Sequence, residues 1–364
     1  MTRQALVAVF NGPGKPLELR TVTVADPVGE EILVRVTGST LCGSDLHTYE
    51  GRRDAPKPSI LGHEILGTIE VFGPEANRRD LAGQPLNEGD RITWSVIAQC
   101  GKCYYCMRGL LQKCERMMKY GHEPLDRGLR GGLAEYCLLA PGSAVLKIPD
   151  TLSDRVACPA SCATATSAAG IRAAGEVQGR VVLVQGAGML GLTTCAMAAA
   201  AGAAEVICSD VVAERLARSE AFGATRTTLP PGLPETVASV TRGQGVDVAI
   251  ELTGTPAAFE EGLPMLRLGG TYVLIGAVYP SRPISLGMET LVRRHLTLRG
   301  IHNYAPEDLK RAIEFLAVSP NRPFESLVEG WYPLTRADEA FNIARKGTAF
   351  RVGVRPDSEL TDGG

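Results

Sequence analysis

The sequence predicts an α/β protein with a β-rich domain and a doubly wound, six-stranded parallel sheet. At 364 residues the chain exceeds the usual size of one hydrophobic core, so two domains are expected. Its first 150 or so residues hold short β-branched runs between Gly and Pro, such as EILVRVTGS (31–39) and LGTIEVFGP (66–74). From about residue 160, apolar runs alternate with alanine-rich helical stretches, a pattern typical of parallel strands joined by crossover helices.

Six candidate strands are expected to form the parallel sheet, the number in a full Rossmann dinucleotide-binding fold. They lie near 181–185, 205–209, 225–228, 246–251, 271–276 and 296–301. We therefore assign 1–155 to a catalytic domain and 156–301 to a dinucleotide-binding domain. Residues 302–364 are expected to return to the first domain with an amphipathic helix, PEDLKRAIEFLA, and a strand, FRVGVRP. The tail DSELTDGG is expected to be disordered.

Composition and charge exclude several classes of function. A formal net charge of -2 and an aromatic content of 5% lack the basic face and stacking aromatics of a nucleic-acid-binding protein. The N-terminus has no secretory h-region, and no stretch approaches the roughly 20 apolar residues that span a bilayer, so we expect a cytoplasmic protein with no membrane partner. In that compartment ten cysteines are not a disulfide framework, and metal ligation is the first hypothesis.

A glycine motif marks the expected cofactor site. In VVLVQGAGMLGL, Gly186, Gly188 and Gly191 follow a β-branched run and open an alanine-rich helix, where they permit a tight turn, an approach to pyrophosphate and close helix packing. Asp210 ends the next expected strand, where its carboxylate can bind ribose hydroxyls and repel a 2′-phosphate. This favours NAD over NADP, although the nearby Arg215 can soften the preference and Asp210 can instead be a solvated strand end.

Four cysteines predict a structural zinc site in a lobe at about 97–116. Cys100, Cys103, Cys106 and Cys114 follow the spacing C-x2-C-x2-C-x7-C, so one loop can bring four thiolates to one ion. Four thiolates close a tetrahedral shell and leave no place for water.

A second, catalytic zinc site needs ligands from distant segments. Cys42, His63 and Cys162 supply two thiolates and one imidazole, which leave the fourth position of a zinc ion open. Singly each is weak evidence, since a lone cysteine is usually a small buried hydrophobe and a lone histidine a satisfied polar group. Spacing alone does not pair Cys42 with Cys162.

Taken together, these segments resemble the medium-chain zinc-dependent alcohol dehydrogenases over nearly the whole chain. The matching segments are CGSDLH (42–47), GHE (62–64), the four-cysteine lobe and GAGMLG (186–191). The resemblance implies a GroES-like catalytic domain in which Cys42, His63 and Cys162 hold the catalytic zinc. It further implies that Glu64 can approach the metal, that Asp45 orients His63, that Ser44 takes the alcohol proton and that His47 passes it to solvent. The residues that it implies for NAD binding are Thr166, Gly186, Gly188, Met189, Leu190, Gly191, Thr253, Ile275, His302 in the 301–303 stretch, and Arg351 at the pyrophosphate.

The implied activity is hydride transfer between NAD(H) and an alcohol or its carbonyl partner, with zinc as the Lewis acid that lowers the pKa of the alcohol. A general short-chain alcohol dehydrogenase, a carbonyl reductase with the same machinery and a non-catalytic zinc- and NAD-binding protein remain alternatives. The family implies a homodimer or homotetramer. Two departures stand out: Gly43 replaces a cation that often faces the pyrophosphate, and Cys162 replaces the Glu usual in polyol and threonine dehydrogenases, which counts against a sorbitol or threonine substrate.

Three stretches resemble a smaller branch of the family proposed to accompany phosphonate metabolism: GLLQKC (109–114), KYGHE (119–123) and PASCATATSAAG (159–170). This favours a phosphonate alcohol or aldehyde as substrate. An anionic substrate needs cations near the zinc, and Lys119, His122, Arg127 and Arg130 are candidates. An ordinary solvated basic loop explains the same residues.

Overall fold

The structure is a computed structural model that describes residues 3–359, and it divides into two compact units. The first unit contains the chain up to Cys162, Ala305–Val318 and the chain from Phe324 onward. The second contains Ala163–Tyr304 and Ser319–Pro323. The first division falls later than residue 155, because the helical turns after Ser153 pack against strands of the first unit.

The second unit is built on a parallel sheet with the strand order β12-β11-β10-β13-β14-β15. Its strands are β10 (Val181–Gln185), β11 (Glu205–Ser209), β12 (Arg226–Thr228), β13 (Val246–Glu251), β14 (Leu266–Leu274) and β15 (Thr297–Gly300). The order reverses between β10 and β13, the switch point at which such sheets bind ligands. β14 begins earlier than expected, because Leu266 already pairs with Val246 before a register shift. The predicted fold class is confirmed.

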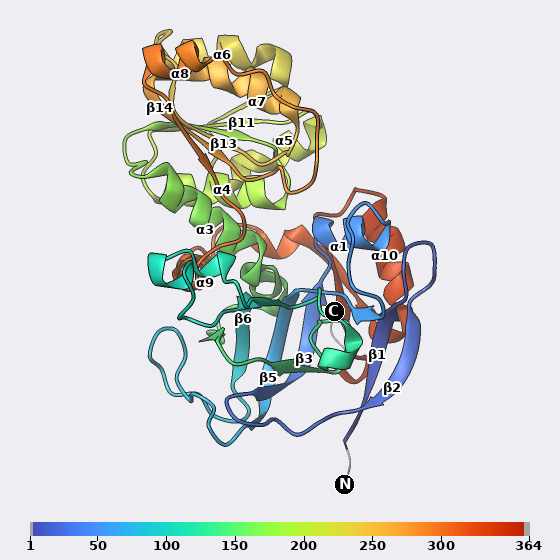
Figure 1. Cartoon of the computed structure of the whole chain (residues 1–364). Helices are drawn as coiled ribbons and strands as arrows, with labels where there is room; N and C mark the ends of the chain where they lie inside the picture. Colours follow the sequence, from blue (N-terminus) through green and yellow to red (C-terminus); the bar gives the residue numbers. More distant parts are fainter. Residues whose placement is uncertain (1–2, 360–364) are drawn as a thin grey trace. The chain divides into compact units, whose positions relative to one another are not determined.

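Helices cover both faces of this sheet. Figure 1 shows α3 and α4 on one face and α6, α7 and α8 on the other. The helices of the unit are α3 (Ala163–Ala174), α4 (Met189–Ala200), α5 (Ala213–Ser219), α6 (Leu233–Thr241), α7 (Pro256–Gly262) and α8 (Met288–Arg294). The central strands β10, β11 and β13 are mostly buried, and for this reason they read as apolar runs in the sequence, whereas the edge strands β12 and β15 are partly exposed.

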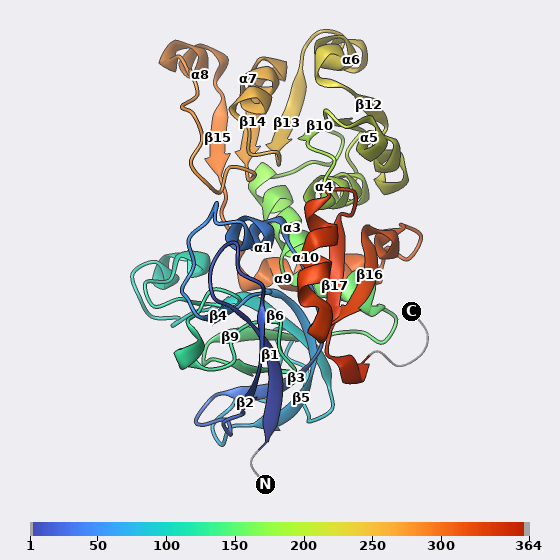
Figure 2. The same cartoon turned by 90° about the vertical axis from the view of Figure 1, so that its right-hand side faces the viewer.

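The first unit is mainly β-structure (Figure 2). Its larger sheet has the order β16-β17-β3-β5-β6-β7, with β8 on β3 and β9 on β6, and a smaller sheet has the order β2-β1-β4. The strands are β1 (Gln4–Phe10), β2 (Glu18–Thr23), β3 (Ile32–Thr40), β4 (Ser59–Ile60), β5 (Glu64–Phe72), β6 (Arg91–Ala98), β7 (Met118–Lys119), β8 (Tyr136–Leu139), β9 (Ser143–Lys147), β16 (Val328–Pro333) and β17 (Arg351–Arg355). Two apolar cores hold these sheets, one around Val34, Ile69 and Trp94 and one around Phe10 and Phe341.

Few helices accompany these strands. They are α1 (Gly43–Tyr49), α2 (Asp154–Ala157), α9 (Pro306–Ala317) and α10 (Ala337–Arg345), and α9 has the bounds of the expected amphipathic segment. The expected disordered tail is partly wrong, since a 3-10 turn spans Asp357–Glu359 and Asp357 accepts a hydrogen bond from Thr335 Oγ1 at 2.7 Å. The rest of that tail, 360–364, lies outside the described residues.

Across residues 3–359, no helix combines the length and apolar character that crossing a membrane requires.

Candidate active site and metal centres

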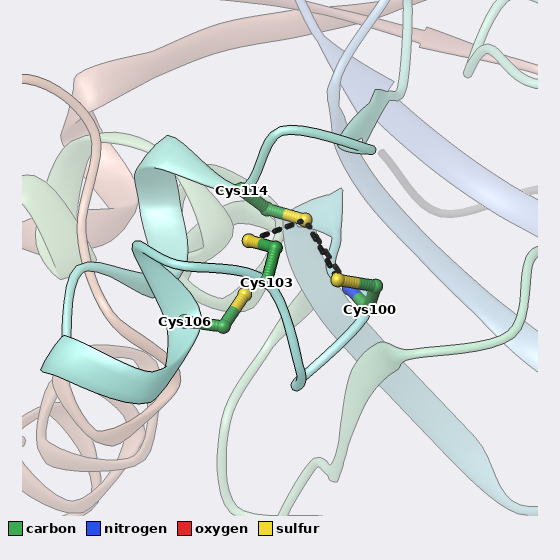
Figure 3. A group of neighbouring side chains, drawn as sticks. All are labelled: Cys100, Cys103, Cys106 and Cys114. Atoms are coloured by element: carbon green, nitrogen blue, oxygen red, sulfur yellow. Dashed lines mark hydrogen bonds between the residues drawn. The ribbon is translucent and has the colours of Figure 1, made fainter.

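The four cysteines of the lobe converge in the loop between β6 and β7. All four Sγ atoms lie within 4.8 Å of one another, and their sulfur atoms face each other in Figure 3. Cys114 Sγ is 3.5 Å from Cys100 Sγ and 4.0 Å from Cys103 Sγ, and it accepts a hydrogen bond from the Arg116 amide at 3.3 Å. Four sulfur ligands around one point match a closed tetrahedral zinc site.

The lobe also favours thiolates at part of this cluster. Hydrogen bonds from the backbone amides of Cys106 and Glu115 lower the pKa of Cys103 to about 6, whereas burial raises the pKa of Cys106 to about 12. A metal ion that binds all four sulfurs must therefore displace protons, most of all from Cys106.

The second cluster is assembled by the pairing of β3 with β5. Thr40 at the end of β3 lies opposite Glu64 at the start of β5, which places Cys42 and His63 side by side just beyond the paired ends. Cys162 arrives from the turn Cys158–Ser161, which packs against the same strands. One ligand atom from each of Cys42, His63, Glu64 and Cys162 lies within 4.8 Å of the others.

Asp45 orients His63, as the resemblance implied. Its buried carboxylate lies 3.0 Å from His63 Nδ1 and accepts hydrogen bonds from the amides of Cys42, at 2.9 Å, and Gly62, at 3.3 Å. The carboxylate fixes the proton on Nδ1 and leaves Nε2 for a metal. Burial alone lowers the pKa of His63, but the charge and hydrogen bond of Asp45 outweigh it and raise the pKa to about 10. A metal ion competes with this proton.

The pKa values of Cys42 and Cys162 are shifted in opposite directions. A hydrogen bond from Cys162 lowers the pKa of Cys42 well below its usual value, and the same contact, with burial, raises the pKa of Cys162. Arg351 adds to the first effect, since its Nη2 lies 3.5 Å from Cys42 Sγ. The pair thus presents a thiolate to any metal even before the second proton leaves.

Glu64 is held by two residues whose contacts the sequence did not reveal. Arg351 donates to both carboxylate oxygens, with Nε at 2.8 Å from Oε2 and Nη2 at 2.8 Å from Oε1, and Thr40 Oγ1 donates to Oε2 at 2.6 Å. Burial raises the pKa of Glu64 to about 7 against the opposing charge of Arg351. The Arg351 guanidinium is itself buried, and its side-chain partners are Glu64 and Cys42 of the metal cluster. Its predicted contact with a pyrophosphate stays a prediction.

Ser44 and His47 lie on α1, directly after Cys42. Ser44 Oγ is 3.4 Å from His63 Nε2, so the hydroxyl faces the metal cluster. Burial and the charge of Arg52 lower the pKa of His47, which favours the neutral ring. The relay from Ser44 to His47 stays a prediction.

The second unit contains a cavity of about 570 Å³ at the carboxyl ends of β10, β11 and β13. The five predicted cofactor residues that line it are Gly186, Gly188, Asp210, Arg215 and Thr253. The Asp210 carboxylate accepts hydrogen bonds from the amides of Ala187, at 2.6 Å, and Val212, at 2.8 Å, which fix it beside the glycine loop. The volume suits part of a dinucleotide.

Steric limits explain the glycines of the loop. Gly186 has φ 102°, a conformation that favours glycine, and a Cβ at Gly191 would lie 1.7 Å from the Gly186 carbonyl oxygen. The other predicted cofactor residues do not line this cavity. Thr166 lies on α3, Met189, Leu190 and Gly191 open α4, Ile275 is buried just beyond β14, and His302 borders a separate depression beside Ala277–Pro280.

Two of the four basic candidates lie near the metal cluster. The His122 ring is 5.7 Å from the His63 ring, centroid to centroid, and the charges of Cys42 and Cys162 act on Lys119. Arg127 is instead exposed and bound to Glu123 at 3.1 Å, and Arg130 is bound to Glu31 at 2.7 Å. For Arg127 and Arg130 the pairing with carboxylates favours the alternative of an ordinary basic loop, and their role as cations for an anionic substrate stays a prediction.

Comparison with known proteins identifies the family. The model of the alcohol dehydrogenase GroES-like domain matches residues 29–150, and that of the zinc-binding dehydrogenases matches residues 190–318. A 5-exo-hydroxycamphor dehydrogenase from Pseudomonas putida is 30% identical over 354 residues, which cover 94% of this chain and 96% of that protein. The chain belongs to the medium-chain zinc-dependent alcohol dehydrogenase family.

Other proteins of this alcohol dehydrogenase family are similar to this chain over nearly its whole length. An L-threonine 3-dehydrogenase from Pyrococcus horikoshii is 29% identical and covers 97% of this chain and 99% of its own length. The crystal structure of an alcohol dehydrogenase from Thermotoga maritima superposes with a TM-score of 0.90 at 29% identity, covering 98% of this chain and all of that one. Zinc and NAD are the cofactors of this dehydrogenase, and the two cysteine clusters and the glycine loop have the side chains to bind them.

Proposed function

We propose that this dehydrogenase transfers a hydride between NAD(H) and an alcohol or its aldehyde or ketone partner at the cluster of Cys42, His63 and Cys162. The observation that carries this proposal is the ligand set: two sulfurs and one imidazole converge, while Arg351 holds the fourth neighbour, Glu64. Three protein ligands and an open position are the arrangement of a catalytic zinc, whereas the four-cysteine lobe has no open position. Zinc bound there supplies a Lewis acid that lowers the pKa of an alcohol.

The chain's own residues orient and move the proton. Asp45 keeps the His63 proton on Nδ1, so that Nε2 faces the cluster. Ser44 Oγ, on the cluster side of α1, accepts the proton that the alcohol loses, and His47, neutral at pH 7, takes it toward solvent. In the reductive direction the same groups return the proton.

Asp210 supports NAD as the preferred dinucleotide. Its carboxylate is fixed at the rim of the cavity by two amides, and a negative charge there opposes a 2′-phosphate. Arg215 lines the same cavity and reduces that discrimination. We also propose a homodimer or homotetramer, since closed symmetric assemblies are the commonest oligomers.

For the substrate we propose a hydroxyalkylphosphonate or its aldehyde. Relatives of nearly equal identity carry different substrate names, hydroxycamphor and threonine, so overall similarity does not select a substrate. Support comes from the resemblance of residues 109–114, 119–123 and 159–170 to the phosphonate-associated branch, and from the position of Lys119 near the cluster. A general short-chain alcohol dehydrogenase or carbonyl reductase is the alternative.

The test is to incubate the zinc-loaded protein with NAD and a panel of simple alcohols, polyols and hydroxyalkylphosphonates while reduced nicotinamide is followed by absorbance. Cys42→Ala removes a proposed zinc ligand and is expected to lose turnover. Turnover of phosphonates alone supports the whole proposal, and turnover of simple alcohols alone removes the phosphonate. No turnover in either direction, with zinc and NAD bound, favours a non-catalytic binding protein.

A further inference from the structure

Two cationic side chains of the first unit come from separate segments to the neighbourhood of the metal cluster. Arg53 follows α1, and its amide donates to the His47 carbonyl at 3.1 Å. Arg53 therefore stays next to the helix whose N-cap residue is Cys42. Lys119 ends β7, where it pairs with Ile97 of β6. The charges of Arg53, of the cluster residues Cys42 and Cys162, and of Asp45 behind His63 all act on the Lys119 ammonium, which therefore lies near the metal cluster and near a second cation.

Among the described residues neither side chain has a hydrogen-bond or ion-pair partner, although basic residues close to them in the chain do. Arg52 is bound to Glu50, Lys57 to Asp54, Arg127 to Glu123 and Arg130 to Glu31. In residues 3–359, by contrast, the Arg53 guanidinium and the Lys119 ammonium make no hydrogen bond or ion pair with the protein. The nearby carboxylate of Glu123 is occupied, since it accepts from the Lys119 amide at 3.1 Å and from Arg127.

This arrangement is costly for the folded protein when no anion is bound. Burial and the like charge of Arg53 lower the pKa of Lys119 to about 8. A partly buried ammonium beside a second cation, without a carboxylate paired to it, is disfavoured, and such perturbed groups gather at functional sites. An anion bound to both side chains would relieve the repulsion and replace the lost hydration.

His122 neighbours both the metal cluster and Lys119. Its Nδ1 is 3.0 Å from the Tyr120 carbonyl oxygen, which can only accept, so Nδ1 donates and Nε2 is left as an acceptor. Its ring lies against that of the zinc ligand His63, and the charge of Lys119 also acts on it. His122 therefore connects the metal cluster with the cationic pair.

From these contacts we propose that Arg53 and Lys119 form a subsite, next to the Cys42–His63–Cys162 cluster, for a carboxylate or phosphonate group of the substrate. The inference rests on the proposed function, since it assigns the reacting hydroxyl or carbonyl to the zinc cluster. It narrows the substrate to a hydroxy compound, or its carbonyl partner, whose anionic group is a few bonds from the reacting carbon. It also adds Arg53, which the sequence did not single out.

Matched substrates that differ in charge test the subsite. The panel pairs 2-hydroxyethylphosphonate with its dimethyl ester and 3-hydroxypropanoate with its methyl ester, and the two pairs separate a phosphonate from a carboxylate. Arg53→Gln and Lys119→Gln are each expected to raise KM for the better anion by about 10- to 100-fold and to leave KM for its ester and kcat largely unchanged. Arg52→Gln, which removes an exposed arginine already paired with Glu50, is the matched control and is expected to leave the KM values unchanged.

Two outcomes overturn the subsite while the proposed function stands: the wild-type protein does not prefer the acids to their esters, or Arg53→Gln and Lys119→Gln change acids and esters equally. If no substrate turns over, the proposed function fails, and calorimetry still tests the subsite. Methylphosphonate and acetate are titrated separately into zinc-loaded wild-type, Arg53→Gln, Lys119→Gln and Arg52→Gln proteins. Weaker binding in only the Arg53 and Lys119 variants supports the subsite, and equal binding in all four proteins overturns it.

Discussion

The two cysteine clusters of the first unit are built in opposite ways. The four-cysteine cluster comes from one short loop, and its sulfurs are surrounded mainly by backbone amides and one another. The cluster of Cys42, His63 and Cys162 comes from three distant segments, and charged side chains surround it: Asp45 behind His63, and Arg351 between Glu64 and Cys42. The four-cysteine cluster needs no side chains beyond its own loop and stabilises that loop. The Cys42 cluster has charged neighbours that orient its ligands and can change the pKa of a bound group.

The largest expected effect comes from the catalytic cluster. His63→Ala removes the imidazole ligand and is expected to lower kcat/KM by about three orders of magnitude, since metal polarisation contributes several kcal/mol and each 1.36 kcal/mol is tenfold. Zinc content measured by elemental analysis should fall from two ions per chain to one. Unchanged kcat/KM would contradict the assignment.

The four-cysteine cluster should respond in stability instead. Cys103→Ser removes the thiol with the lowered pKa and is expected to cost several kcal/mol of folding free energy, because binding of a structural zinc is part of folding. Thermal unfolding should begin earlier, while kcat of the folded protein stays within about twofold to threefold of wild type. A variant as stable as wild type but inactive would reverse the roles assigned to the two clusters.

A substitution at Asp45 tests a smaller and more specific effect, the orientation of His63 by a neighbouring carboxylate. Asp45→Asn keeps the shape but removes the charge behind His63, and it is expected to weaken zinc at that cluster by about 10- to 100-fold, without effect on the four-cysteine zinc. Competition with a chelator measures both affinities in one protein. The exposed Asp126→Asn is the control, and equal zinc affinity in the two variants would exclude the orienting role.

The smallest expected effect is a pH dependence at the proposed anion subsite. The pKa of Lys119 is lowered from 10.5 to about 8, so its positive charge is present below that pH and is lost as the pH rises through it. KM for an anionic substrate should therefore rise by up to about tenfold between roughly pH 7 and pH 9, beyond any change seen with the ester. The charged or titratable groups near Lys119 are Arg53, Cys42, Cys162, Asp45, His122 and Glu123. Lys119→Arg, which keeps the positive charge, should flatten the difference. An equal rise for acid and ester would exclude Lys119 as the cause.

The same contrast explains what the sequence could predict. The four-cysteine lobe and the glycine loop are local, so spacing alone indicated their ligands and turns. The central strands β10, β11 and β13 appear as apolar runs because they are mostly buried. The second cluster needed family resemblance, since it depends on the register that sets Thr40 opposite Glu64. The position of Arg351 was not predictable, because it depends on the pairing of β17 with β3, which are far apart in sequence.

Partner choice among charged side chains was equally hidden. Arg127 and Arg130 carry the same charge as Lys119 and follow it closely in the chain. Glu123 binds Arg127, however, and Glu31 binds Arg130. Arg53 was not among the residues predicted from the sequence, because the sequence does not show which arginines lack a partner. Within residues 3–359, the Arg53 guanidinium makes no hydrogen bond or ion pair. Only the structure distinguishes a paired surface arginine from an available one.

Cobalt substitution separates the reacting role of the Cys42 cluster from the structural role of the four-cysteine cluster. Cobalt(II) replaces zinc in Cys103→Ser, which leaves only the Cys42 cluster, and in His63→Ala, which leaves only the four-cysteine cluster. Visible absorption is recorded while NAD and substrate are added. We expect a spectral change in Cys103→Ser and none in His63→Ala. A change confined to His63→Ala would show that the roles of the two clusters are reversed.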